Sequence, residues 1–114
     1  MKATKVQVRS KVWLEAQGRP VLGPGRRELL QAIEEQGSIS SAARLLNLTY
    51  RKAWGQIKAM EVRLGLPLVV KQTGGQGGGG ACLTGEARDL LSRYARLAHG
   101  LEEEVNEKFR RIFL

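Results

Sequence analysis

Residues 38–54 read S-I-S-S-A-A-R-L-L-N-L-T-Y-R-K-A-W, and this stretch decides the fold. A serine, Ser38 or Ser40, can cap a short helix over about residues 40–46, because its hydroxyl can accept a hydrogen bond from the free amides of the first turn. Asn47 tolerates the left-handed backbone conformation that ends such a helix. The stretch therefore predicts a short helix followed at once by a turn.

A longer helix should follow that turn. Thr49 can cap it, and it should run to about Leu64, where Gly65 and Pro67 end it. A turn of about three residues between two helices is the geometry of a helix-turn-helix. Small and apolar side chains fall where the helices would cross, namely Ala42, Ala43, Leu46, Leu48, Ala53 and Ile57. A plain helical hairpin that binds nothing fits this spacing equally well.

Upstream, the sequence predicts a strand and a further helix. Residues 6–14 alternate apolar with basic or polar side chains, which is the two-residue period of a half-buried strand, and Gly18 to Pro20 should break it. Pro24 suits the first turn of a helix, where a missing N–H costs nothing, and Gly37 should end that helix. The buried stripe of this helix would consist of Leu29, Leu30 and Ile33.

Downstream, six glycines occupy the seven positions 74–80, between short apolar runs at residues 68–71 and 81–83. Two strands placed directly after a helix-turn-helix indicate a wing. Glycines lose the most backbone entropy on folding, so a closely approaching partner would account for the run, and a disordered loop tip is the alternative. The run formally fits the dinucleotide pattern G-x-G-x-x-G, but a returning strand follows it where that pattern needs a helix.

The last segment, from Thr84, reads as one amphipathic helix with apolar residues at steps of three and four. Its expected length of about 35 to 40 Å is more than so small a domain can bury. We therefore expect part of the stripe to pair two copies of the chain. The expected dimer interface consists of Leu90, Tyr94, Leu97, Leu101 and Val105. The alternative is a helix that folds back on its own core.

Composition and charge narrow the class of protein. The chain of 114 residues carries a net charge of +8, all of it in residues 1–72, which hold 13 Lys and Arg against 5 Asp and Glu, and this favours nucleic acid as the partner. A lone cysteine, Cys82, excludes an internal disulfide and a multi-cysteine metal site. No apolar run is long enough to cross a bilayer, so we expect a cytoplasmic protein without a membrane partner. The only histidine, His99, has no catalytic partner by spacing, so an enzyme is not expected.

The start of the helix after the turn carries basic and polar side chains, where solubility alone would mix in acids. Arg51 and Lys52 can bond guanine edges or phosphates, and Gln56 can reach adenine. A merely solvated basic face is the alternative. Trp54 is expected in the core, because its spacing from Ile57 is that of a buried stripe.

Three motifs combine in this chain: G-S-I-S at residues 37–40, Y-R-K-A-W at residues 50–54 and T-G-G-Q-G-G-G-G-A at residues 73–81. With them the chain closely resembles, over roughly residues 5–97, the N-terminal DNA-binding domain of the ModE family of molybdate-responsive transcriptional regulators. It is more distantly similar to the LysR-type winged helix. The resemblance implies that the helix after the turn enters the major groove, that the glycine-rich wing lies against the backbone or minor groove, and that the C-terminal helix pairs two subunits.

Residue by residue, the resemblance and the basic face together give the DNA-binding residues that we expect. They are Thr49, Tyr50, Arg51, Lys52, Gln56, Lys58, Arg44, Lys71, Gly74, Gly75, Gln76, Gly77 and Gly78. The predicted fold is mostly α with a small β component, a winged helix-turn-helix region over residues 1–84 and a dimerisation helix over residues 85–114. No cofactor and no metal are expected.

Family members continue into oxyanion-binding modules after this domain, whereas this sequence ends at Leu114. We therefore expect either that a separate protein senses the oxyanion or that DNA binding proceeds without that signal. The favoured function is a transcriptional regulator that binds a near-palindromic site in double-stranded DNA as a homodimer. The alternatives are a non-specific architectural DNA-binding protein, a DNA-binding subunit that depends on a separate effector protein and, more weakly, an oxyanion-binding module that uses the glycine loop.

Overall fold

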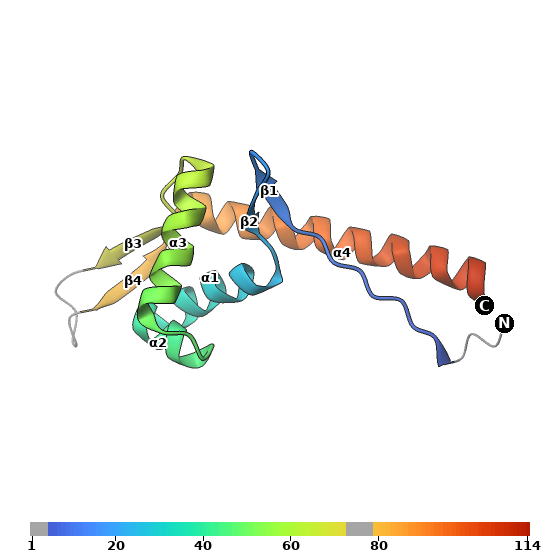
Figure 1. Cartoon of the computed structure of the whole chain (residues 1–114), viewed down its shortest axis with the longest axis horizontal. Helices are drawn as coiled ribbons and strands as arrows, with labels where there is room; N and C mark the ends of the chain where they lie inside the picture. Colours follow the sequence, from blue (N-terminus) through green and yellow to red (C-terminus); the bar gives the residue numbers. More distant parts are fainter. Residues whose placement is uncertain (1–4, 73–78) are drawn as a thin grey trace.

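A computed structural model of the chain describes residues 5–72 and 79–114. Within them, three helices over residues 24–64 pack together, and we call this part the head. Two small hairpins flank the head and one long helix projects from it, so that the molecule measures 61 × 28 × 21 Å (Figure 1). In chain order the elements are β1 (Leu14–Ala16), β2 (Arg19–Leu22), α1 (Pro24–Gln36), α2 (Ile39–Leu45), α3 (Tyr50–Leu64), β3 (Val69–Gln72), β4 (Gly80–Leu83) and α4 (Gly85–Phe113).

The helices of the head begin and end at local signals in the sequence. Gly37, with φ 75°, ends α1 and donates its N–H to the carbonyl of Ile33. The Ser38 hydroxyl caps α2, and the Thr49 hydroxyl caps α3 by accepting the N–H of Lys52 at 3.1 Å. Asn47, with φ 59°, turns the chain between α2 and α3. The predicted helices are therefore confirmed to within one residue.

One apolar core joins the three helices of the head to both hairpins. The side chains predicted at the helix crossing are buried or packed against this core. The largest fully buried side chains are Leu22, Leu29, Leu30, Ile33, Ile57, Met60, Leu68 and Val21.

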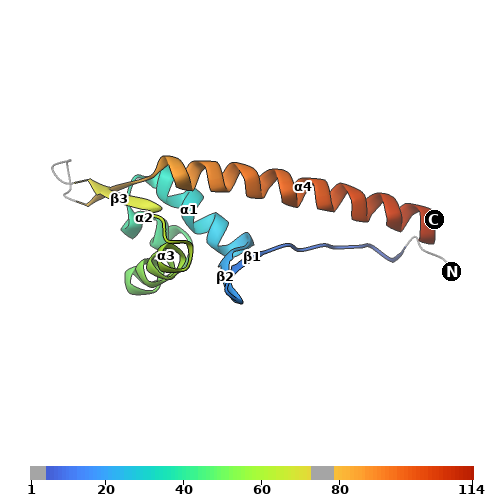
Figure 2. The same ribbon diagram turned by 90° about the horizontal axis from the view of Figure 1, so that it is seen from above.

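The predicted N-terminal strand over residues 6–14 is wrong. Residues 6–13 belong to no strand, and the short β1 begins only at Leu14, where it pairs antiparallel with β2. The turn between β1 and β2 is made by Gln17 and Gly18, both with positive φ, which is the backbone of a tight two-residue hairpin. Alternation predicts an extended chain, but a strand also needs a neighbouring strand as its hydrogen-bonding partner. Residues 6–13 instead extend away from the head on the same side as α4 (Figure 2).

The wing hairpin is fixed to the head at its base. Strands β3 and β4 pair antiparallel from Val69 opposite Leu83 to Gln72 opposite Gly80. The N–H of Ala81 donates to the carbonyl of Gly37 at 2.8 Å, which ties β4 to the end of α1. Thr73 and the rest of the glycine run, residues 74–78, lie outside the described residues.

Helix α4 starts on the head and then leaves it. Its 29 residues span about 44 Å, longer than predicted. Ala87 and Tyr94 are buried, and Arg88 forms two hydrogen bonds of 3.1 Å with the Glu34 carboxylate of α1. Figures 1 and 2 both show the C-terminal half of α4 projecting beyond the head. Within residues 5–72 and 79–114, none of the helices has the length and apolar character required to span a membrane.

Candidate nucleic-acid interface

The first half of α3 divides into an inward apolar side and an outward basic side. Ala53 and Ile57 are buried in the core. Arg51 and Lys52, directly before Ala53, are exposed, and Gln56 is partly buried. The division arises because buried positions recur every three to four residues on a helix, which leaves the intervening residues facing solvent. Arg51 and Lys52 are therefore accessible to a partner, and Gln56 is accessible in part.

A second outward stripe of α3 faces the wing. Tyr50, Trp54 and Lys58 recur every four residues and so lie along one side of the helix, next to β3. The predicted burial of Trp54 is wrong, because its indole is 40% exposed. Ala53, Ile57 and Met60 already fill the inward stripe of α3, so Trp54 lies at the edge of the core, partly accessible to solvent.

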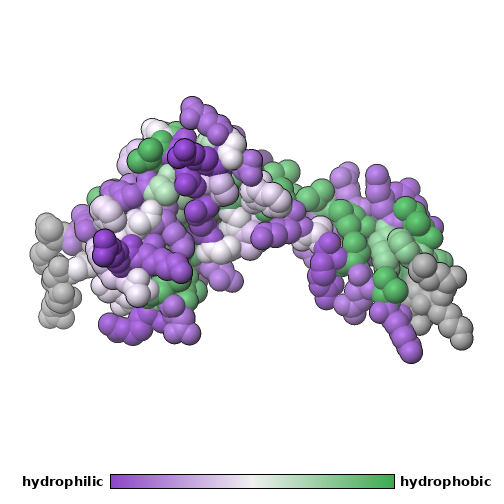
Figure 3. Space-filling model, viewed as in Figure 1, coloured by the Kyte–Doolittle hydropathy of each residue, from purple (hydrophilic) through white to green (hydrophobic). Residues whose placement is uncertain are grey.

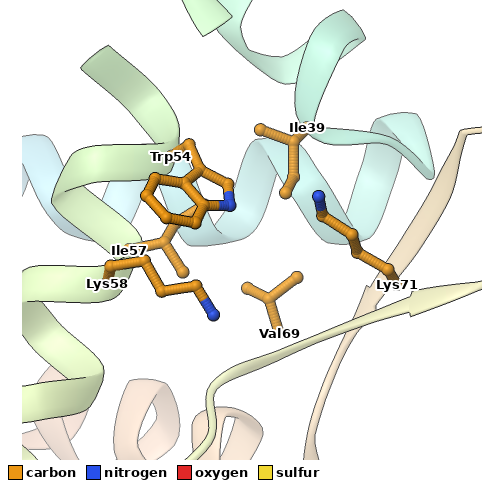
Figure 4. Close-up of a pocket in the computed structure, with 6 residues that line it drawn as sticks. All are labelled: Ile39, Trp54, Ile57, Lys58, Val69 and Lys71. Atoms are coloured by element: carbon orange, nitrogen blue, oxygen red, sulfur yellow. The ribbon is translucent and has the colours of Figure 1, made fainter. Parts of the chain in front are cut away.

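A cavity of about 320 Å³ opens between this stripe and the wing. Trp54 and Lys58 line it from α3, Val69 and Lys71 from β3, and Ile39 from α2 (Figure 4). The Lys58 ammonium lies 5.5 Å from the centroid of the Trp54 ring. We call this cavity the helix–wing cleft; its walls carry cationic and aromatic groups, and its floor is aliphatic.

A second cavity, of about 380 Å³, continues the accessible surface toward the wing tip. Lys71 and Ile39 line both cavities, and Tyr50, Ser40 and Gly80 line the second one only. The Lys71 ammonium lies 5.9 Å from the centroid of the Tyr50 ring. The groove between α3 and the wing therefore runs from Lys58 to the described end of the glycine run.

Glu61, which the sequence analysis missed, fixes the position of the wing relative to α3. Its carboxylate accepts the N–H groups of Leu68 at 2.8 Å and Val69 at 3.2 Å, and it pairs with the Lys58 ammonium at 3.1 Å. Burial alone would raise the pKa of this carboxyl, but the hydrogen bonds from Leu68, Lys58 and Val69 together hold the pKa below its ordinary value. The sequence feature that could have drawn attention to Glu61 is that it is the only acidic residue in α3.

The other predicted site residues are either exposed or outside the described residues. Arg44, in the last turn of α2, is exposed, and Lys71 is exposed on β3. Thr49 is exposed, and its hydroxyl already caps α3. Gly74, Gly75, Gln76, Gly77 and Gly78 lie outside the described residues.

The fold and the groove define a winged helix-turn-helix protein, with α2 and α3 as the helix pair and β3–β4 as the wing. The chain belongs to the lysR family of bacterial regulatory helix-turn-helix proteins, whose pattern matches residues 26–88. This family consists of regulators rather than enzymes, which confirms the expectation from the sequence.

Individual relatives confirm the resemblance to ModE proteins. The chain is 41% identical over 80 residues to the molybdenum-pterin-binding protein MopB of Rhodobacter capsulatus, covering 70% of this chain and 30% of that protein. It is 42% identical over 76 residues to the molybdenum transport protein ModE of Azotobacter vinelandii, covering 67% and 28%. The chain thus matches less than a third of the length of these relatives.

Solved structures show the same fold. The DNA-binding domain in the CbnR_DBD–DNA complex aligns with a TM-score of 0.57 at 22% identity, over 76% of this chain and 93% of that one. At this identity the likeness establishes the winged-helix architecture alone.

Proposed function

We propose that the chain binds a near-palindromic site in double-stranded DNA as a homodimer and thereby regulates transcription. The observation that carries the proposal is the exposed basic start of α3 beside the cationic groove of the wing. Such a surface matches a major groove flanked by phosphates, because an α-helix fits that groove and lysines attract the backbone.

The first turn and a half of α3 supplies the groups for reading base edges. Arg51 carries a planar guanidinium that can bond both acceptors of a guanine, and Gln56 carries an amide suited to adenine. Lys52 and Arg44 bring further positive charge to the same end of the helix pair. In the proposed complex these side chains give the sequence preference, while Lys58 and Lys71 hold the backbone.

The proposed dimer rests on the projecting part of α4. Beyond Tyr94, apolar side chains continue at helical spacing: Leu97 is 49% exposed, and Leu101 and Val105 are partly buried. Figure 3 shows apolar residues gathered along this part of the molecule. Gly100 lies in a shallow groove between Leu97 and Leu101, where a second helix could approach closely. Tyr94 is 3% exposed within its own chain, so we omit it from the proposed interface.

The link to molybdenum comes from the relatives. Their names describe molybdenum-pterin binding, molybdenum transport and transcriptional regulation. Because these relatives match the chain over about two thirds of its length or more, we propose a role in regulating genes of molybdenum metabolism. The bacterial chromosome lies in the cytoplasm, so the proposed function implies a cytoplasmic location.

Selection of bound fragments from a random duplex pool, at near-physiological salt and with or without molybdate, tests the proposal. An enriched inverted repeat is the expected result. The Arg51→Ala variant should lose the preference for that repeat, whereas Arg19→Ala, an equal charge change on the exposed hairpin strand β2, should keep it. Binding without enrichment would favour the architectural alternative, and enrichment only with molybdate would place sensing within this chain.

A further inference from the structure

The helix–wing cleft combines two kinds of surface that a simple basic patch lacks. Figure 4 shows the nitrogen atoms of Trp54, Lys58 and Lys71 around the cleft, together with the aliphatic side chains of Ile39 and Val69. Among the described residues, the six that line the cleft are Ile39, Trp54, Ile57, Lys58, Val69 and Lys71, a set of donors and apolar groups with no acid among them.

Glu61 does not neutralise the cleft. Its carboxylate is only 13% exposed and is turned toward the backbone of Leu68, while the Lys58 side chain remains 49% exposed. A lysine ammonium has three N–H donors, so the one pointing at Glu61 leaves two for a ligand. The Lys58–Glu61 pair therefore fixes the direction of the Lys58 side chain along the cleft wall.

A chain of alternating phosphates and deoxyriboses has the complementary chemistry. Phosphate oxygens accept the N–H groups of Trp54, Lys58 and Lys71, and the apolar face of a deoxyribose can cover Ile39 and Val69. A small free oxyanion would use the donors but would leave the aliphatic floor bare. The continuation of the groove past Tyr50 and Gly80 also suits a polymer better than a small ion.

We infer that the helix–wing cleft is a seat for one deoxyribose-phosphate unit of a DNA strand, and that Trp54 donates its indole N–H to the phosphate. This inference rests on the proposed function, in which Lys58 and Lys71 already contact the backbone, and adds that they share one phosphate with Trp54. It assigns the exposed tryptophan a contact that carries no sequence information, in contrast to Arg51.

Scanning with single methylphosphonates, which remove the charge of one phosphate at a time, tests the seat. For the wild-type protein, one position per half-site should weaken binding by about tenfold or more. In the Lys71→Gln variant the same position should weaken binding by a clearly smaller factor, because only Lys58 and Trp54 still lose a charged partner there, and the salt slope of binding should fall by about 0.9. In the matched variant Lys108→Gln, an equal charge change on the exposed part of α4, both quantities should equal those of the wild type.

The indole contact has its own test. Trp54→Phe keeps the ring but removes the N–H, so binding to every duplex should weaken by about fivefold with an unchanged order of preferred sequences. A changed order would instead make Trp54 a base-reading residue and would overturn the assignment to the backbone. An unchanged affinity would show that the N–H makes no contact.

Tryptophan fluorescence separates the DNA backbone from a free oxyanion. In a Trp13→Phe background only Trp54 emits, and Trp13 is itself half exposed, so its replacement leaves the core intact. Duplex DNA should quench the emission, whereas millimolar phosphate or molybdate should leave it unchanged; quenching by either free ion would make the cleft a small-oxyanion site and overturn the inference. If the wild type binds DNA but Lys71→Gln has the same methylphosphonate profile, the cleft does not bind a phosphate, and only this inference is refuted. If the wild type does not bind DNA, the proposed function itself is refuted.

Discussion

The carboxylate of Glu61, in the last turns of α3, accepts the backbone N–H of Leu68 at 2.8 Å. The same carboxylate oxygen also accepts the backbone N–H of Val69, at 3.2 Å. One acid thus sets the direction in which the chain leaves α3 and enters the wing. Because Trp54 and Lys58 lie on the α3 side of the cleft and Lys71 on the wing side, this contact also sets the width of the cleft.

Replacing Glu61 by alanine should destabilise the fold. Glu61→Ala leaves the N–H groups of Leu68 and Val69 without their acceptor, and Leu68 is fully buried, so the free energy of unfolding should fall by about 1–3 kcal/mol. Glu61→Gln retains one acceptor oxygen and should cost less. Urea denaturation followed by circular dichroism measures both; equal stability of the alanine variant and the wild type would mean that the wing base is held by the sheet alone.

The same carboxylate should make stability depend on pH. The pKa of Glu61 is lowered in the folded chain, so the folded state favours the charged form. Its contribution is therefore complete above the unfolded value, about 4.5, and is lost as the pH falls through the lower folded value. Glu34, whose pKa is lowered by its hydrogen bond from Arg88, adds in the same direction. Urea midpoints between about pH 3 and pH 6 should fall less steeply with acidification in Glu61→Gln than in the wild type.

The two threonine caps should differ in their contribution to stability. Thr49 accepts only the N–H of Lys52, whereas the Thr84 hydroxyl accepts the N–H of Ala87 at 3.1 Å and donates to the carbonyl of Pro67 at 2.7 Å. Thr49→Ala should cost about 1 kcal/mol, as for a typical cap, and Thr84→Ala should cost more because a second bond is lost. Thermal unfolding of the two variants side by side gives the comparison, and an inverted order would contradict the double role of Thr84.

Local signals in the sequence predicted the helical head well. Gly37, Asn47 and Thr49 act on their immediate neighbours, so their effect on the chain can be seen without knowing the fold. The wing strands were also predicted, although the residues expected at the wing tip lie outside the described part of the chain. The solvent-facing side of α3 followed from helical periodicity, since the buried Ala53 and Ile57 dictate which side of the helix faces inward; that this side reads DNA stays a prediction.

The errors concern contacts between residues far apart in the sequence. The extended segment before β1 is held where the Tyr94 hydroxyl donates to the Val12 carbonyl at 2.7 Å, across 82 residues, and alternation cannot reveal that partner. Trp54 has the spacing of a core residue, but the volume of the core was already filled by Ile57 and Met60. Glu61 acts through a turn whose geometry depends on Gly65, with φ 68°, and its role could not be inferred from position alone.

The Tyr94–Val12 contact should control the N-terminal segment. Tyr94→Phe removes the hydroxyl but keeps the buried ring, so the free energy of unfolding should fall by about 0.5–1.5 kcal/mol. Trypsin should then cleave faster after Arg9 and Lys11, because the segment loses the hydrogen bond that joins it to α4. Tyr50→Phe, which alters an exposed ring, is the control and should leave the cleavage rate unchanged.

The proposed dimer makes the last prediction. Leu97→Glu places a charge on the apolar stripe of α4, and a charge buried between two helices without a partner costs several kcal/mol, so the variant should sediment as a monomer where the wild type is a dimer. Ser92→Glu makes the same kind of change on the opposite side of α4 and should remain dimeric. The monomer keeps its recognition helix, so it should still bind a single half-site but lose the affinity gained from an inverted repeat. Dimeric Leu97→Glu with full affinity for the repeat would place the subunit contact on another surface.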